Sequence, residues 1–205
     1  MYNRGIDKKN IFNDKYDIVR FFQSMEEFNT IEPIGSIYEN SFIKKGLNSL
    51  GTSGSKLVNF IAYCLNPNHY HFILEQKVDC GVSKFMGRLS GGYTKYFNKK
   101  NKRGGFLFQG PFKVRHVNSN DYLLHLSAYV NLNNHVHKLG DANFKNKIKS
   151  SWEEYTTGKT NFCKKDIVLD QFKSVKDYET FASDALDLMI EKKKNDKEIA
   201  ELLLE

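Results

Sequence analysis

Two apolar runs on either side of a tight turn signal constrain the fold of this chain more than any other feature. The first run spans Leu57–Leu65 and the second spans His69–Gln76. The three residues between them, Asn66-Pro67-Asn68, are typical of a turn. Short runs that meet at such a turn pair naturally as an antiparallel hairpin. The sequence therefore predicts an antiparallel β-hairpin over residues 57–76.

Helices are expected before and after the hairpin in the sequence. Residues 14–29 and 82–99 place apolar side chains at three- and four-residue intervals, which is the spacing of an amphipathic helix. Gly91 and Gly92 fall in the middle of the second helix, where they would bend it or let another segment approach its backbone closely. The remaining expected elements are a short helix near 40–47 in a loop over 32–55, a strand region over 106–117 broken by Gly110-Pro111, and helices over 121–133 and 175–204.

The length of 205 residues suits one domain with an appended tail. We expect a main domain over 1–140 and a helical C-terminal extension over 141–205; two small domains are the alternative. No apolar run is long enough to cross a bilayer and no apolar signal stretch opens the chain, so we expect a cytoplasmic protein without a membrane partner. The three cysteines lack Cys-x-x-Cys spacing, which predicts reduced thiols and neither disulfides nor a structural zinc site.

The net charge of +7 is unevenly distributed. From Cys80 through Asn120 the chain has no Asp or Glu. The basic residues of this stretch are Lys84, Arg88, Lys95, Lys99, Lys100, Lys102, Arg103, Lys113 and Arg115. Aromatic residues are interleaved with them, and this combination suits a nucleic acid, whose phosphates are neutralised while its bases stack. A solvated basic face over an aromatic core explains the same pattern equally well.

His69 and His71 form the first candidate site. Side chains two residues apart in a strand project from the same face, so both imidazoles can reach one metal ion. The spacing alone is a weak signal, because a polar strand face that binds no metal has the same pattern.

Tyr129 and Asn133 form the second candidate site, since residues four apart on one helix share a face. An amide oxygen beside two imidazoles would suit Mg²⁺ or Mn²⁺, and such an ion would stabilise charge while a tyrosine attacks a phosphodiester. A half-buried helix tyrosine and a helix-capping asparagine are the ordinary alternatives.

Several short motifs follow one another in a fixed order over about residues 2–137. They are Asn3-Arg4-Gly5, Asn66 to His71, Ser83 to Met86, Tyr93 to Asn98, Leu107 to Gly110, and Tyr122 to Tyr129 with Asn133. This order resembles the single-tyrosine HUH transposases and, within them, the REP-associated tyrosine transposases. Four features depart from the usual pattern: a very short segment precedes Arg4, Asn134 stands where Pro is common, Tyr70 separates the two histidines, and the segment 32–55 is longer than expected.

The resemblance implies an α+β fold with a central antiparallel sheet flanked by helices, ferredoxin-like in outline. It implies that His69, His71 and Asn133 bind Mg²⁺ or Mn²⁺ and that Tyr129 is the nucleophile. The reaction would nick and rejoin single-stranded hairpin DNA through a 5′-phosphotyrosine intermediate with a free 3′-hydroxyl, which is the chemistry of DNA transposition. A domesticated protein that binds hairpin DNA without cutting it is the alternative. A replication initiator or relaxase of the wider HUH group is a third hypothesis.

The expected partner is single-stranded or hairpin DNA, and a homodimer is left open. Residues expected to contact DNA are Arg4, Lys84, Arg88, Lys95, Lys99, Lys100, Gln109, Lys113 and Arg115. His125 lies four residues before Tyr129 and could deprotonate it, although a partly exposed helix histidine is the simpler interpretation. The charged helix of the C-terminal extension is compatible with capping the domain, with dimerisation and with DNA contact.

Overall fold

The computed structural model describes residues 1–40, 55–136, 148–159 and 162–202. At its centre the predicted hairpin pairs in antiparallel register, with Asn66 opposite His69 across the turn. Two short strands extend this pair into a four-stranded antiparallel sheet in the order β1-β3-β2-β4. The strands are β1 (Tyr2–Arg4), β2 (Val58–Asn66), β3 (His69–Gln76) and β4 (Lys149–Ser150).

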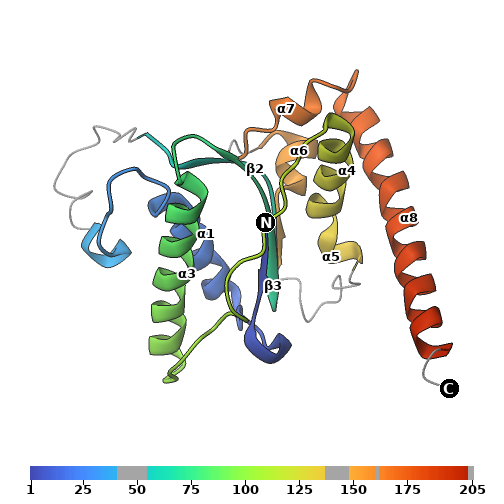
Figure 1. Cartoon of the computed structure of the whole chain (residues 1–205). Helices are drawn as coiled ribbons and strands as arrows, with labels where there is room; N and C mark the ends of the chain where they lie inside the picture. Colours follow the sequence, from blue (N-terminus) through green and yellow to red (C-terminus); the bar gives the residue numbers. More distant parts are fainter. Residues whose placement is uncertain (41–54, 137–147, 160–161, 203–205) are drawn as a thin grey trace.

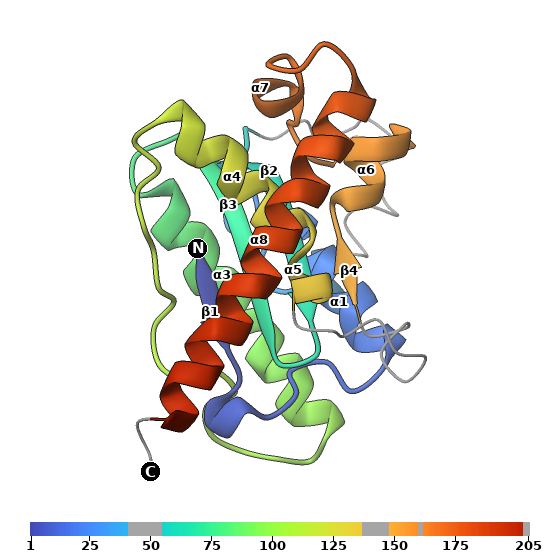
Figure 2. The same ribbon diagram turned by 90° about the vertical axis from the view of Figure 1, so that its right-hand side faces the viewer.

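Helices cover both faces of the sheet (Figure 1). On one face lie α1 (Lys15–Glu27) and α3 (Gly81–Lys100), and on the other lie α4 (Asn120–Asn131), α6 (Trp152–Thr157) and α8 (Val175–Leu202). The remaining short helices are η1 (Ile6–Lys8), α5 (Asn133–Val136) and α7 (Asp166–Leu169). Figure 2 shows α8 lying across the outside of α4. The fold is therefore α+β, with a central antiparallel sheet flanked by helices, as predicted.

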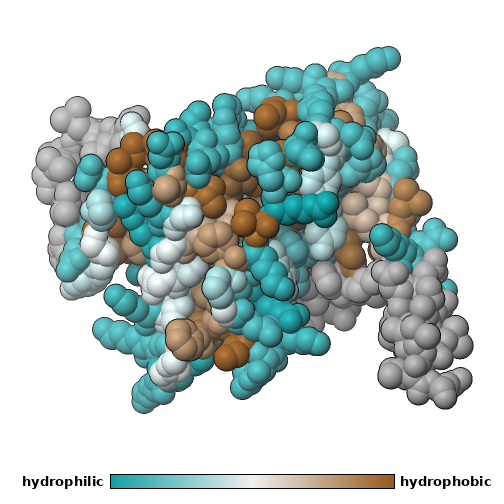
Figure 3. Space-filling view, viewed as in Figure 1, coloured by the Kyte–Doolittle hydropathy of each residue, from teal (hydrophilic) through white to brown (hydrophobic). Residues whose placement is uncertain are grey.

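The sheet separates two hydrophobic clusters, because alternate residues of a strand point to opposite faces. On β3, Tyr70 and Phe72 belong to the cluster under α1 and α3, whereas Ile73 belongs to the cluster under α4 and α8. In β2 a register shift lies between Phe60 and Ala62, and the two consecutive residues Ile61 and Ala62 both belong to the cluster under α4 and α8. Outside the clusters the surface is mostly hydrophilic, with apolar side chains in separate patches on the face seen in Figure 3.

The segment 106–117, predicted as a broken strand region, is not a regular strand. Gly110 has a left-handed backbone with φ of 79°, and Pro111 has no amide hydrogen to donate to a neighbouring strand. The segment nevertheless follows the free edge of β1 through two isolated antiparallel bridges. These bridges join Tyr2 to Lys113 and Gly5 to Phe108.

The helix predicted over 121–133 is shorter than expected. Ser119 caps its start by accepting a hydrogen bond from the Tyr122 amide. α4 then ends at Asn131, and Asn133 begins the separate short helix α5. The prediction that Tyr129 and Asn133 share one helix is therefore wrong, because the chain leaves helical geometry at Leu132, where φ is −107° and ψ is 13°.

The other predicted elements differ little from the structure. α3 is continuous through Gly91, and a Cβ on Gly92 would lie 2.5 Å from the Phe28 ring, so close approach is the reason for glycine there. The short helix expected near 40–47 falls largely outside the described residues. The three cysteines are unpaired. Among the helices that the structure describes, none is both long enough and apolar enough to cross a bilayer.

Candidate functional site

The two histidines project from β3 toward the face that α4 covers. Their ring centroids lie 5.2 Å apart and the rings are nearly perpendicular. Tyr129 reaches the same place from α4, with its ring centroid 5.4 Å from that of His71. A pocket of about 590 Å³ is lined by Tyr2, Arg4, Lys8, Asn68, His69, His71 and Tyr129. The structure thus brings the predicted nucleophile and both predicted histidines into one pocket.

Three amide side chains surround the ring of His69. Its Nδ1 lies 2.6 Å from Asn68 Oδ1, whereas its Nε2 lies 3.0 Å from Asn66 Nδ2 and 3.1 Å from Asn133 Oδ1. Because Asn68 Oδ1 can only accept, the hydrogen-bond network assigns the ring proton to Nδ1 and leaves a lone pair on Nε2. A neutral imidazole held by its other nitrogen in this way is the form that binds metal ions.

Asn133 completes a group of lone-pair donors at this place. It is fully buried, and its Oδ1 accepts a hydrogen bond from Asn66 Nδ2 at 2.8 Å. The Asn66 amide group therefore donates to two acceptors at once, the Oδ1 of Asn133 and the Nε2 of His69. Two such acceptors 3.1 Å apart, with the His71 ring beside them, fit a divalent cation as two nitrogen ligands and one oxygen ligand.

The three candidate metal ligands, His69, His71 and Asn133, include no acidic side chain. Among the described residues, no group of three His, Cys, Asp or Glu side chains is gathered at one point. The third ligand of an ion bound by His69 and His71 would therefore be the amide oxygen of Asn133. Cys64 lies opposite His71 in the β2–β3 register, but burial raises the pKa of its thiol to about 12. Without a metal ion beside it, the thiol thus stays protonated at neutral pH.

The phenol of Tyr129 lies in an environment that favours its neutral form. Burial raises its pKa above the ordinary value, and the nearby Tyr2 and Cys64 add to this effect. The side chain of Asn133, from a different helix, acts in the opposite direction and lowers this pKa. A neutral phenol is a weak nucleophile, so the loss of its proton must be coupled to attack.

Tyr2, Asn66 and Asn68 belong to the site, although sequence reasoning gave them no role there. The antiparallel β1–β3 register places Tyr2 opposite His71, with ring centroids 4.8 Å apart. Asn66 and Asn68 had been assigned to the turn before His69. Their position next to His69 and His71 could have indicated this role, because polar side chains at the end of a strand lie close to a site formed on that strand.

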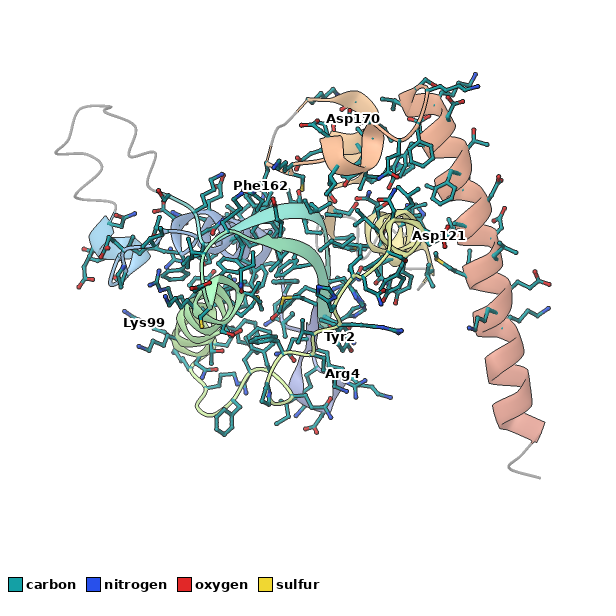
Figure 4. The ribbon with its side chains drawn as sticks, turned by 45° about the horizontal axis from the view of Figure 1, so that its top comes forward. Tyr2, Arg4, Lys99, Asp121, Phe162 and Asp170 are labelled. Atoms are coloured by element: carbon teal, nitrogen blue, oxygen red, sulfur yellow. The ribbon has the colours of Figure 1, made fainter. Side chains whose placement is uncertain are left out.

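Part of the predicted DNA-contacting set lies beside the pocket. Arg4 lines the pocket, and its Nε donates to Gln109 Oε1 at 2.6 Å. Lys113 is held by two backbone hydrogen bonds with Tyr2, and Arg115 follows on the same segment. Figure 4 shows Tyr2 and Arg4 close together on β1. The pocket therefore has basic groups at the β1 edge of the sheet.

The other part lies on α3, across the sheet from α4. These residues are Lys84, Arg88, Lys95, Lys99 and Lys100. Arg88 donates to the backbone carbonyls of Thr30 and Ile31, and Lys100 pairs with the buried carboxylate of Asp17 at 2.6 Å. Arg88 and Lys100 thus make contacts within the protein, whereas Lys84, Lys95 and Lys99 are exposed. Figure 4 shows Lys99 well separated from Tyr2 and Arg4.

His125 does not reach the pocket. Its Nε2 lies 3.7 Å from Asp121 Oδ1, and its ring packs against Phe181 with centroids 5.0 Å apart. It is half exposed. These contacts agree with an ordinary helix histidine on the outer side of α4.

Comparison with known proteins supports a relationship for the segment that carries the site. No curated protein and no solved structure matched the chain. A family model matches residues 47–133. This segment contains β2, β3, α3 and α4, and with them His69, His71, Tyr129 and Asn133. The family model that these residues match is described as "Transposase IS200 like", and the match covers less than half of the chain.

Proposed function

We propose that this protein is a metal-dependent transposase and endonuclease that nicks and rejoins single-stranded hairpin DNA through a 5′-phosphotyrosine intermediate. One observation carries the proposal: His69, His71 and Tyr129 line one pocket, and the Oδ1 of the buried Asn133 lies 3.1 Å from the Nε2 of His69. The transposase-family match covers the same four residues. A protein that only binds DNA has no need of this combination.

The residues of the pocket divide the work of phosphoryl transfer. Tyr129 Oη attacks the phosphorus, and an O–P bond forms to the strand that begins 5′ at the cut. The P–O3′ bond breaks, the released oxygen takes up a proton to become a free 3′-hydroxyl, and the phenol proton passes to solvent. Rejoining reverses these steps when a 3′-hydroxyl attacks the phosphotyrosine and Tyr129 recovers a proton.

The surrounding groups would bind and orient the DNA. His69, His71 and Asn133 would hold Mg²⁺ or Mn²⁺, which when bound stabilises negative charge on the phosphate oxygens. Arg4 and Lys8 line the same pocket and would neutralise neighbouring phosphates. The ring of Tyr2, which lies against His71, offers an aromatic surface to a base.

The test is formation of a covalent protein–DNA adduct. The protein is incubated with Mn²⁺ or Mg²⁺ and a hairpin oligonucleotide that carries a single-stranded flank, and the products are separated under denaturing conditions. We expect an adduct with the wild type and none with Tyr129→Phe, while DNA binding is retained.

The matched control is Tyr122→Phe, which removes a phenolic hydroxyl from the first turn of the same helix, outside the residues that line the pocket. This variant should form the adduct normally. An adduct with Tyr129→Phe would contradict the assignment of the nucleophile. DNA binding without any adduct, in wild type as well, would instead support a non-cleaving hairpin-binding protein.

A further inference from the structure

We infer that Tyr178, on the C-terminal helix α8, is a positioning residue for Tyr129. It completes a buried hydrogen-bond network that fixes the rotation of α4 about its own axis, and therefore the direction in which the phenol of Tyr129 points. This inference rests on the proposed role of Tyr129 as nucleophile.

Tyr178 holds α4 on the side that faces away from the pocket. Its side chain is fully buried, and its hydroxyl oxygen lies 3.1 Å from Ser127 Oγ and 2.8 Å from Asn131 Nδ2. Ser127 and Asn131 are four residues apart on α4 and share a face. Tyr129 lies two residues from each of them, which places it about half a turn away around the helix. A small rotation of α4 at this contact would therefore move the phenol in the pocket.

The hydrogen bonds of the network can be assigned so that each hydroxyl group donates one hydrogen bond and accepts another. Asn131 Nδ2 donates to the Tyr178 oxygen, the Tyr178 hydroxyl donates to Ser127 Oγ, and the Ser127 hydroxyl donates to the Leu124 carbonyl at 2.7 Å. The other end of the Asn131 amide, Oδ1, accepts from the Ser151 hydroxyl at 2.5 Å. A buried network in which every member is paired favours one arrangement over its neighbours.

Ser151 connects the network to the sheet that carries the histidines. Its Oγ accepts from the Tyr63 amide of β2 at 2.9 Å, and the next residue, Cys64, is paired with His71 of β3. The phenol on α4 and the imidazole on β3 are thus both positioned relative to β2. Around the network the cluster is apolar, with Ala128, Val130, Ala182 and Ala185 among its buried members. Apolar contacts between helices are non-directional, so the hydrogen bonds of the network are what fix the rotation of α4.

The ring of Tyr178 is held independently of its hydroxyl. It packs against Tyr155, Phe172 and Trp152, with centroid distances of 5.2, 5.3 and 6.1 Å. Tyr178→Phe should therefore keep the ring and the packing of α8 on α4 (Figures 1 and 2) while removing only the hydrogen bonds to Ser127 and Asn131.

A matched variant separates positioning from simple loss of stability. Tyr155 is buried in the same cluster, and its hydroxyl donates to the backbone carbonyl of Ile61 at 2.8 Å, on the sheet and not on α4. Tyr155→Phe and Tyr178→Phe each remove one buried hydroxyl, so we expect similar decreases in Tm. At saturating DNA, the single-turnover rate of adduct formation should fall about tenfold or more in Tyr178→Phe only, because a small misplacement of the nucleophile is costly. The Kd for DNA should be unchanged in both.

A second readout does not depend on cleavage. In protein with ¹³C-labelled tyrosine rings, the Tyr129 resonance, assigned with Tyr129→Phe, should shift in Tyr178→Phe and stay in place in Tyr155→Phe. Equal rates and an unmoved Tyr129 resonance in Tyr178→Phe would overturn the inference. If the wild type forms no adduct, the proposed function fails, and the resonance alone decides whether Tyr178 positions Tyr129. Should Tyr178→Phe not fold, Ser127→Ala removes the same contact from the α4 side and should give the same two changes.

Discussion

The two faces of the sheet use polar residues in different ways. On the α4 face, amide side chains fix the ring of His69, and a buried network joins α4 to α8 and β2. On the α3 face, basic residues are spread along one helix; Arg88 and Lys100 stabilise neighbouring segments, while the other cations are exposed. Chemistry requires groups held in one geometry, whereas attraction of a polyanion requires charge without exact placement. The contrast predicts that substitutions on the two faces will affect different measurements.

The largest effect is expected for His71→Ala, on the α4 face. The change removes one of three proposed ligands, so the affinity for Mn²⁺ should fall at least about 100-fold and the adduct should become undetectable. Calorimetric titration with Mn²⁺ and the adduct assay measure the two effects. His125→Ala, on the outer side of α4, is the matched control and should change neither. Unaltered Mn²⁺ binding in His71→Ala would show that the protein does not bind the metal ion on this face of the sheet.

A smaller loss is expected for Asn68→Ala. Without the Asn68 oxygen, the Nδ1 hydrogen of His69 loses its acceptor and the metal-binding tautomer is no longer fixed. Loss of such a supporting hydrogen bond commonly lowers metal affinity about 10- to 100-fold. The same titration provides the measurement. Asn13→Ala removes an exposed amide that donates to Asn101 and lies outside the residues lining the pocket, and it serves as the control; an equal loss there would point to a general effect on folding.

Lys100→Met should lower stability and leave catalysis intact. It removes the cation beside the buried Asp17 carboxylate, which should cost about 1–3 kcal/mol in the free energy of unfolding by urea. The Lys100 hydrogen bond also lowers the pKa of Asp14. A carboxyl whose pKa is lowered in the folded state stabilises the protein at pH values above the ordinary aspartate pKa. This stabilisation is lost as the pH falls through the lowered pKa. The variant should therefore lose less stability on acidification than the wild type. Unchanged stability, with weaker DNA binding, would reassign Lys100 to the DNA surface.

The smallest effect is expected for the triple variant Lys84→Gln, Lys95→Gln, Lys99→Gln. If these exposed cations contact phosphates, the slope of log affinity against log salt concentration for single-stranded DNA should decrease by about two. The rate of adduct formation at saturating DNA should stay as in the wild type. Fluorescence anisotropy at several salt concentrations measures the slope. A decrease in the saturated rate would show that the two faces are not separable.

Local patterns were enough to predict the elements on which the site is built. The turn signal at Asn66-Pro67-Asn68 predicted the hairpin, and strand alternation predicted that His69 and His71 share a face. The α+β class was implied by the ordered motifs. These features depend on residues that are close in the sequence, where backbone geometry limits the outcomes to a few.

The break between α4 and α5 was not predicted, because local propensity does not report where tertiary packing ends a helix. Asn133 lies on its own short helix, yet it contacts His69 from there. The membership of Tyr2 in the site depends on the β1–β3 register, which pairs residues 69 positions apart, Tyr2 and His71. Sequence reasoning also treated Arg88 and Lys100 as DNA contacts, whereas their hydrogen-bond partners within the protein became visible only in the fold.

The sequence by itself determined which chemical groups this protein carries, and it predicted that His69 and His71 share a strand and that Tyr129 lies on a helix. The tertiary structure decided which groups meet: three amides at one imidazole, a phenol beside the second imidazole, and a tyrosine of the C-terminal helix behind the nucleophile. The physical reason is that side-chain periodicity is a local property of the backbone. Hydrogen bonds between distant segments depend instead on strand register and helix rotation, which only the packed core selects.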